Sequence, residues 1–104
     1  MPPLTHRLTV QYFRPTDPAA FEAAYRERHV PLAQAVPGLQ RLTVSTPRGG
    51  DDAPYLVAEL WFADRDTLRA GLASPEMTAA AADAETYDVA YRVAFTGGVE
   101  DLLP

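Results

Sequence analysis

Hydrophobic and polar residues alternate along four stretches of the chain, the pattern expected of β-strands that bury at least one face. Between these stretches the apolar residues recur at helical spacing instead. The first helical stretch follows Asp17 and Pro18, which supply an N-cap oxygen and a proline at the first helical position. Later helices are expected after Asp64 and Ser74. The predicted strands span residues 4–13, 39–47, 54–63 and 89–96.

The predicted elements follow the order βαββαβ within 104 residues, a length typical of one domain. We therefore treat residues 1–104 as a single domain of the α+β class. The order predicts a ferredoxin-like fold, in which helices cover one face of a four-stranded antiparallel sheet. Strands 4–13 and 54–63 are expected side by side in the middle, although the pattern also permits another strand order.

Strand 54–63 is apolar on both faces. Leu56, Leu60 and Phe62 alternate with a second set that includes Val57 and Trp61. A face in contact with water would carry polar residues at every second position. We therefore expect a second copy of the chain to cover this face, with Val57, Glu59 and Trp61 at the interface of a homodimer.

The stretch FEAAYRERHVPLAQAVPGL, residues 21–39, begins as an amphipathic helix. Phe21 and Tyr25 lie on its apolar face, and His29 falls at the edge of that face, one turn after Tyr25. Pro31 has no N–H to donate and disfavours helical geometry at the residue before it. The helix is expected to end near His29, or to kink there and resume through Ala35, and to leave carbonyls near Glu27 without intrahelical partners.

Composition excludes several classes of function. The formal net charge is −5, from 14 acidic and 9 basic residues, so nucleic acid and anionic membranes are unsuitable partners. Cysteine is absent, which removes thiolate nucleophiles and thiolate metal sites. No stretch has the features of a signal peptide or the roughly 20 apolar residues of a membrane span. We expect a cytoplasmic protein with no membrane attachment.

Metal and nucleotide sites lack sequence support. No HxH, HxxxH or CxxC pattern occurs, and the two histidines stand on different elements. Neither glycine pair opens a helix in the way that a phosphate-binding loop does. We therefore expect no metal and no cofactor. The acidic residues that would complete a metal site with His6 and His29 are Glu22, Glu27 or Asp83.

An aromatic cluster is the remaining candidate for chemistry. It is either ordinary core with tyrosine hydroxyls at its rim, or the lining of an apolar cavity for an aromatic or polyketide-like ligand. His29 is correspondingly a general acid or base, or a residue at a helix end without a catalytic role. If His29 is buried, its pKa should fall unless a carboxylate such as Glu22 or Asp83 reaches it. The expected cluster comprises Tyr12, Phe21, Tyr25, His29, Phe62 and Tyr91, above the aliphatic residues Val10 and Leu60.

The motif Tyr25-x-x-x-His29-Val30-Pro31-Leu32 resembles the signature region of the EthD family. Phe21 before it and Pro37-Gly38-Leu39 after it belong to the same resemblance. The later segments Leu60-Trp61-Phe62-Ala63-Asp64, Ser74-Pro75-Glu76 and Ala82-Asp83 are similar to the second half of that family. The resemblance implies a dimeric α+β barrel, in which two four-stranded sheets face each other and the helices pack outside.

For function, the resemblance implies action on a small hydrophobic substrate by cofactor-independent oxidoreductase or monooxygenase, isomerase or dehydratase chemistry. His29 would be the acid or base, and Tyr25 would orient the ring or bind the ligand. The alternative is a non-catalytic dimeric barrel that binds a hydrophobic metabolite or assists an oxidative degradation pathway. The residues expected to contact the substrate are Tyr12, Phe21, Phe62, Tyr91 and, as a weaker candidate, His6.

Overall fold

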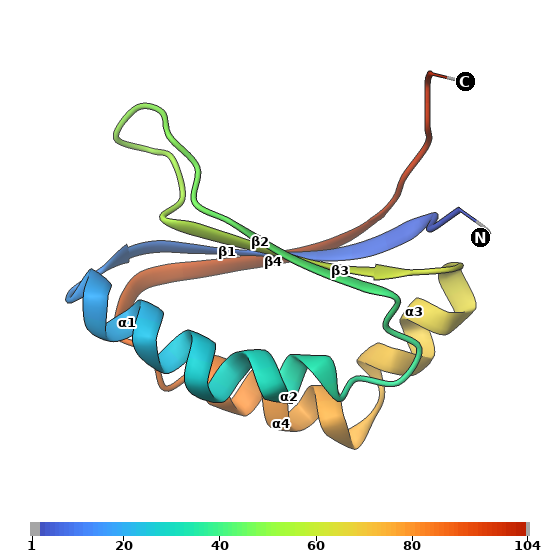
Figure 1. Ribbon diagram of the computed structural model, residues 1–104, viewed down its shortest axis with the longest axis horizontal. Helices are drawn as coiled ribbons and strands as arrows, with labels where there is room; N and C mark the ends of the chain where they lie inside the picture. The colour runs from blue at the N-terminus through green and yellow to red at the C-terminus, as the bar shows by residue number, and fades with distance from the viewer. Residues whose placement is uncertain (1–2, 104) are drawn as a thin grey trace.

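Four antiparallel strands form one sheet in the order β2-β3-β1-β4, and the helices cover one of its faces (Figure 1). The computed structural model describes residues 3–103. The order confirms that the first and third strands lie in the middle of a ferredoxin-like sheet. The elements are β1 (His6–Pro15), α1 (Pro18–Ala24), the π-helix η1 (Tyr25–His29), α2 (Val30–Gln34), β2 (Arg41–Ser45), β3 (Leu56–Phe62), α3 (Arg65–Leu72), α4 (Pro75–Ala84) and β4 (Val89–Gly98).

The helix starts predicted from the sequence are confirmed by their caps. The side chain of Asp17 accepts a hydrogen bond from the amide of Ala20, and Asp64 accepts one from Thr67. Ser74 accepts one from the amide of Met77. Each bond satisfies an amide that has no partner within the first turn of its helix.

The helix does not end at Pro31. α1, η1 and α2 follow one another without a break, and the irregularity takes the form of a π turn in which the amide of Val30 bonds to the carbonyl of Tyr25. The carbonyl that gains a side-chain donor is that of Ala24, which accepts a bond from the Tyr87 hydroxyl, rather than one near Glu27. Irregular backbone beside the histidine is thus found, as an insertion within the helix.

The core lies between the sheet and the helices. On the helix-facing side of the sheet, Leu8 pairs with Leu60 and Val10 with Ala58. Leu56 and Phe62 are fully enclosed. A close approach at one end of this layer requires glycine in α3, because a Cβ at Gly71 would lie 2.9 Å from Cε1 of Phe62.

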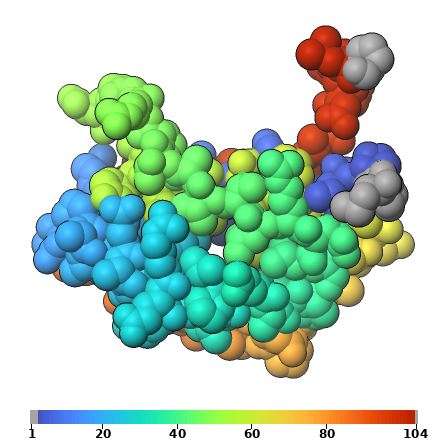
Figure 2. Space-filling view, viewed as in Figure 1, coloured from blue at the N-terminus to red at the C-terminus, as the bar shows by residue number. Residues whose placement is uncertain are grey.

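The other face of the sheet is exposed along β4. Tyr91, Val93 and Phe95 are 44%, 38% and 47% exposed. The loop of residues 46–55 and the tail of residues 99–103 project on this side, away from the helices (Figure 1). Figure 2 shows both projections standing out from the body of the molecule.

The expected inward orientation of Tyr91 is wrong. Register pairs Tyr91 with Phe13 on the outer face, where the two rings stack with centroids 4.4 Å apart. Because side chains alternate along a strand, the adjacent residue Arg92, opposite Tyr12, lies on the helix-facing side instead.

No helix among residues 3–103 is long and apolar enough to cross a membrane.

Replacing Gly71 with alanine should lower the free energy of unfolding by about 1–3 kcal/mol, because the new methyl group overpacks the contact with Phe62. It would also lie 3.0 Å from the carbonyl oxygen of Pro37. Urea denaturation measures the change. Gly50→Ala is the matched control, since a Cβ there meets no atom within 4 Å. Equal stability of the two variants would contradict the prediction.

Candidate functional site

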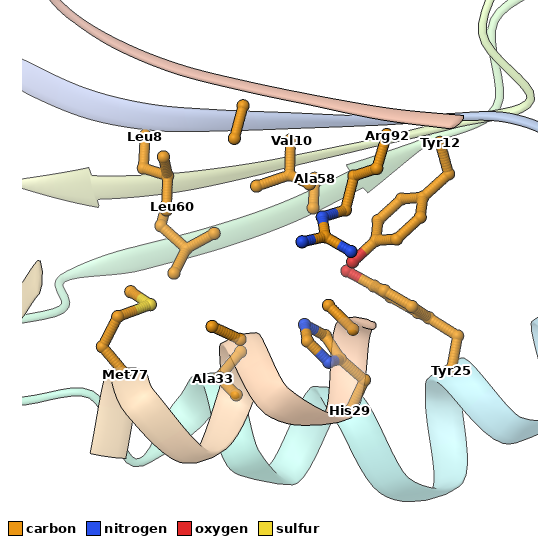
Figure 3. A pocket seen from close by; sticks show the side chains of 14 residues that line it. Leu8, Val10, Tyr12, Tyr25, His29, Ala33, Ala58, Leu60, Met77 and Arg92 are labelled. Carbon is orange, nitrogen blue, oxygen red and sulfur yellow. The ribbon is translucent and has the colours of Figure 1, made fainter. Parts of the chain in front are cut away.

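A cavity of about 160 Å³ lies between the helix-facing side of the sheet and the helical layer (Figure 3). Most of its lining is aliphatic, and polar side chains gather at one end. The lining residues are Leu8, Val10, Tyr12, Tyr25, His29, Ala33, Ala58, Leu60, Met77, Ala80, Ala81, Ala84, Arg92 and Ala94.

The alanine content of α4 leaves this space open. The helix has the sequence PEMTAAAADA, and Ala80, Ala81 and Ala84 line the cavity. An alanine side chain ends at its Cβ and reaches only a short way from the helix. These three positions therefore leave the space between α4 and the sheet unfilled. Met77 closes the apolar end from the same helix (Figure 3).

His29 lies at the polar end of the cavity and is 8% exposed. Its ring stacks on Tyr25, with centroids 4.9 Å apart. Its Nδ1 atom is 3.1 Å from Oδ2 of Asp83. An ionised carboxylate can only accept, so we assign the proton to Nδ1 and the lone pair to Nε2. Figure 3 shows one ring nitrogen of His29 directed into the cavity.

The carboxylate of Asp83 accepts hydrogen bonds from three side chains. In addition to His29, the Tyr87 hydroxyl donates to Oδ2 at 2.6 Å, and Nε of Arg28 donates to Oδ1 at 3.2 Å. Burial acts to raise the pKa of Asp83, but the bonds from Tyr87, His29 and Arg28 outweigh it and hold that pKa below its ordinary value. Asp83 therefore remains an acceptor at neutral pH.

The pKa of His29 is lowered, because burial disfavours the imidazolium. The hydrogen bond and charge of Asp83 act in the opposite direction and do not overcome burial, while the positive charge of Arg92 adds a smaller lowering effect. At neutral pH the ring is thus neutral, and its free nitrogen is available as a proton acceptor.

The tyrosine hydroxyls at this end of the cavity keep their protons. Burial raises the pKa of Tyr12 to about 12 and also raises that of Tyr25. Figure 3 shows both hydroxyls directed towards the part of the cavity that the Arg92 guanidinium occupies. They can therefore serve as hydrogen-bond donors to a ligand.

A family model for the EthD domain matches residues 14–87 of this chain. The chain belongs to the EthD domain family. The match includes the π turn, α4 and both members of the His29–Asp83 pair. It confirms the family indicated by the Tyr25-x-x-x-His29 motif.

Three similar proteins extend this result. An EthD family protein from Bacillus halodurans has a TM-score of 0.82 and 26% identity, over 95% of this chain and all of its own. An uncharacterised 11.0 kDa protein from the thcB-thcC intergenic region of Rhodococcus erythropolis is 36% identical over 79% of this chain and 82% of its own. SnoaB from Streptomyces nogalater, a cofactor-independent oxygenase crystallised as its N63A mutant, shares the fold, with a TM-score of 0.65 and 23% identity over 98% of this chain and 99% of its own.

The sequence indicates seven residues as catalytic or substrate-binding candidates. The cavity brings together three of them, namely Tyr12, Tyr25 and His29. Phe21 and Phe62 belong to the surrounding core and are not part of the lining. His6 contacts Thr5 through Nδ1 and also lies outside the lining. Tyr91 occupies the other face of the sheet.

Two features of this EthD site needed the structure. The sequence does not single out Arg92, because the more apolar residues of β4 are the ones expected on the inner face. Residues alternate between the two faces of a strand, so an outward Tyr91 would have indicated an inward Arg92. Asp83 was one of two possible partners of His29. The other, Glu22, instead accepts a hydrogen bond from Tyr55 at 2.8 Å.

We predict that His29 titrates below the ordinary value of 6.5. Because the unfolded chain binds this proton more readily than the folded one, His29 should make the free energy of unfolding decline as pH falls through about 6.5. NMR titration of the His6→Gln variant, which retains a single imidazole, measures the pKa. Asp83→Asn should lower it further by removing the negative charge. A pKa at or above the ordinary value would contradict the prediction.

Proposed function

We propose that this protein is a cofactor-independent enzyme in which His29 removes a proton from a small apolar substrate bound in the cavity. The observation that carries the proposal is the hydrogen bond from Nδ1 of His29 to Asp83, which directs a basic nitrogen towards an apolar space. A general base needs its lone pair free at the working pH, and the lowered pKa of His29 meets that requirement.

The proposed step is a proton transfer from a C–H next to a carbonyl group. The bond to hydrogen breaks, its electron pair enters the carbonyl system to form an enolate, and Nε2 of His29 takes the proton. Asp83 stabilises the resulting imidazolium at a hydrogen-bond distance of 3.1 Å. Tyr25 supports the ring by stacking and presents a donor hydroxyl to the ligand.

The enolate has two simple fates. Return of the proton to a different carbon is an isomerisation, whereas transfer of electrons from the enolate to O₂ oxidises the substrate and reduces the oxygen. The shared fold with SnoaB, described as a cofactor-independent oxygenase, supports the oxidative fate. The first proton transfer is common to both fates, so it can be tested before the natural substrate is known.

The protein should accelerate exchange of the acidic C–H protons of 2-tetralone in D₂O, measured by loss of their NMR signals. His29→Gln should abolish the acceleration, because the amide cannot accept the proton. His6→Gln is the matched control, since His6 lies outside the cavity lining. The exchange rate should fall as pH drops through the His29 pKa.

Two results would contradict a catalytic role. Exchange that persists in His29→Gln would show that another group is the base. Binding of 2-tetralone without accelerated exchange would favour the alternative, a barrel that binds apolar metabolites without transforming them. Thermal melts of the variant separate loss of the base from loss of the fold.

We also propose that the outer face of the sheet forms a homodimer. Tyr91, Val93 and Phe95 expose an apolar strip on β4, and monomeric proteins seldom leave large apolar patches in water. Residues 46–55 and 99–103 project on the same side and can flank a second copy (Figure 1). The exposed strip lies on β4, whereas Trp61 and Glu59 on this face are partly covered, the latter by an ion pair with Arg7.

Phe95→Arg should convert the dimer to a monomer, because it places an unpaired charge within an apolar contact. Light scattering at micromolar concentration measures the mass. Ala70→Arg, at an exposed position of α3, is the control and should remain dimeric. A monomeric wild-type protein would refute the proposed interface.

A further inference from the structure

Arg92 is a cation in a cavity whose lining is otherwise mainly aliphatic. Its side chain descends from β4 towards the helices and ends beside the polar group of lining residues (Figure 3). Within residues 3–103, no carboxylate lies within 4.0 Å of its guanidinium. The nearby acid Asp83 is already engaged by Arg28, His29 and Tyr87.

The positive charge at this end of the cavity belongs to a group that only donates hydrogen bonds, and two hydroxyls beside it can donate as well. The guanidinium has only N–H donors, and the hydroxyls of Tyr12 and Tyr25 remain protonated. Among the lining side chains of residues 3–103, the basic nitrogen that faces this space is Nε2 of His29. A group that complements these donors has lone pairs and negative charge, and the aliphatic remainder of the cavity suits an uncharged ring.

We propose that the cavity selects small aromatic or alicyclic molecules bearing an acidic oxygen, a phenol or an enol, which it binds as the anion on Arg92. In a half-enclosed apolar site, a charge-assisted hydrogen bond from a guanidinium is stronger than the corresponding bond to a neutral oxygen. The apolar ring of the ligand then lies against Leu8, Leu60 and Met77 at the other end of the cavity.

This inference rests on the proposed function for its place in a reaction. If His29 removes a proton from carbon, the negative charge moves to the carbonyl oxygen, which is the atom that Arg92 would hold. Arg92 then stabilises the enolate more than the neutral ketone, and that difference lowers the barrier to proton removal. The preference for an anion can nevertheless be measured by binding alone.

The test compares 4-nitrophenol, whose anion is yellow, with its methyl ether 4-nitroanisole, which cannot ionise. Calorimetry gives the two affinities of the full-length protein, and visible absorbance gives the ionisation state of the bound phenol. The phenol should bind as its anion and at least about tenfold more tightly than the ether near neutral pH. The apparent pKa of 4-nitrophenol should fall when it binds.

Arg92→Met should reduce affinity for 4-nitrophenol by about tenfold and change affinity for 4-nitroanisole by less than about twofold, because the aliphatic stem is retained. Arg92→Lys retains the charge and should preserve part of the preference. Arg69→Met, which removes the same charge from an exposed position of α3, should behave like the wild type. Thermal melts verify that each variant is folded.

The proposal is overturned if the wild type binds phenol and ether equally, if neither binds at millimolar concentration, or if folded Arg92→Met keeps the full preference. Loss of the preference in His29→Gln but not in Arg92→Met would assign it to the imidazolium instead. These results differ from a failure of the proposed proton transfer, in which anion binding remains dependent on Arg92 while exchange of 2-tetralone is not accelerated.

Discussion

The Asp83 carboxylate is the constraint on which the polar end of the cavity depends. Asp83 lies in α4 and joins this helix to η1 by accepting bonds from Arg28 and His29. It also accepts a bond from Tyr87, just beyond the end of α4. These bonds set the tautomer of His29 as well as its position. Loss of the Arg28 or the Tyr87 donor would change the charge that Asp83 presents to the His29 ring as well as the contacts around Asp83, so this carboxylate has both a structural and a chemical role.

The cavity has an energetic cost that the rest of the fold must offset. Unfilled apolar space loses the dispersion contacts that close packing would provide. The alanines of α4 maintain that space, while a dense aromatic cluster around Tyr12, Phe21 and Tyr25 packs next to it, with ring centroids 5.3–5.8 Å apart. The π turn contributes in a related way, because it accommodates Pro31 without ending the helix that carries Tyr25 and His29. Local irregularity of this kind is frequent at functional sites.

The sequence contains enough information for the element order and the helix caps, because alternation and capping are local properties. It favours the central pair of strands but leaves another strand order open, because strand pairing is not a local property. The sequence also limits the hydrogen-bond partner of His29 to two acidic residues.

The hydrophobic pattern is misleading at β4, where the odd-numbered residues Tyr91, Val93 and Phe95 are apolar and the even-numbered residues include Arg92. Alternation tells which residues share a face, but not which face meets the helices. The usual assumption that the more apolar face is internal fails here, since the inner face carries the cation of the cavity and the outer face carries the exposed aromatic residues.

One consequence of β4 concerns how this chain can diverge. Its odd and even residues form two interleaved sets, one turned outward and the other towards the cavity. Single substitutions can therefore modify the outer surface or the pocket independently. Deletion or insertion of one residue near the start of the strand would reverse the faces of the residues that follow it, placing aromatic rings in the cavity and a guanidinium on the outer surface. The number of residues in β4 therefore keeps the two faces distinct, while the identity of each residue sets the properties of the face on which it lies.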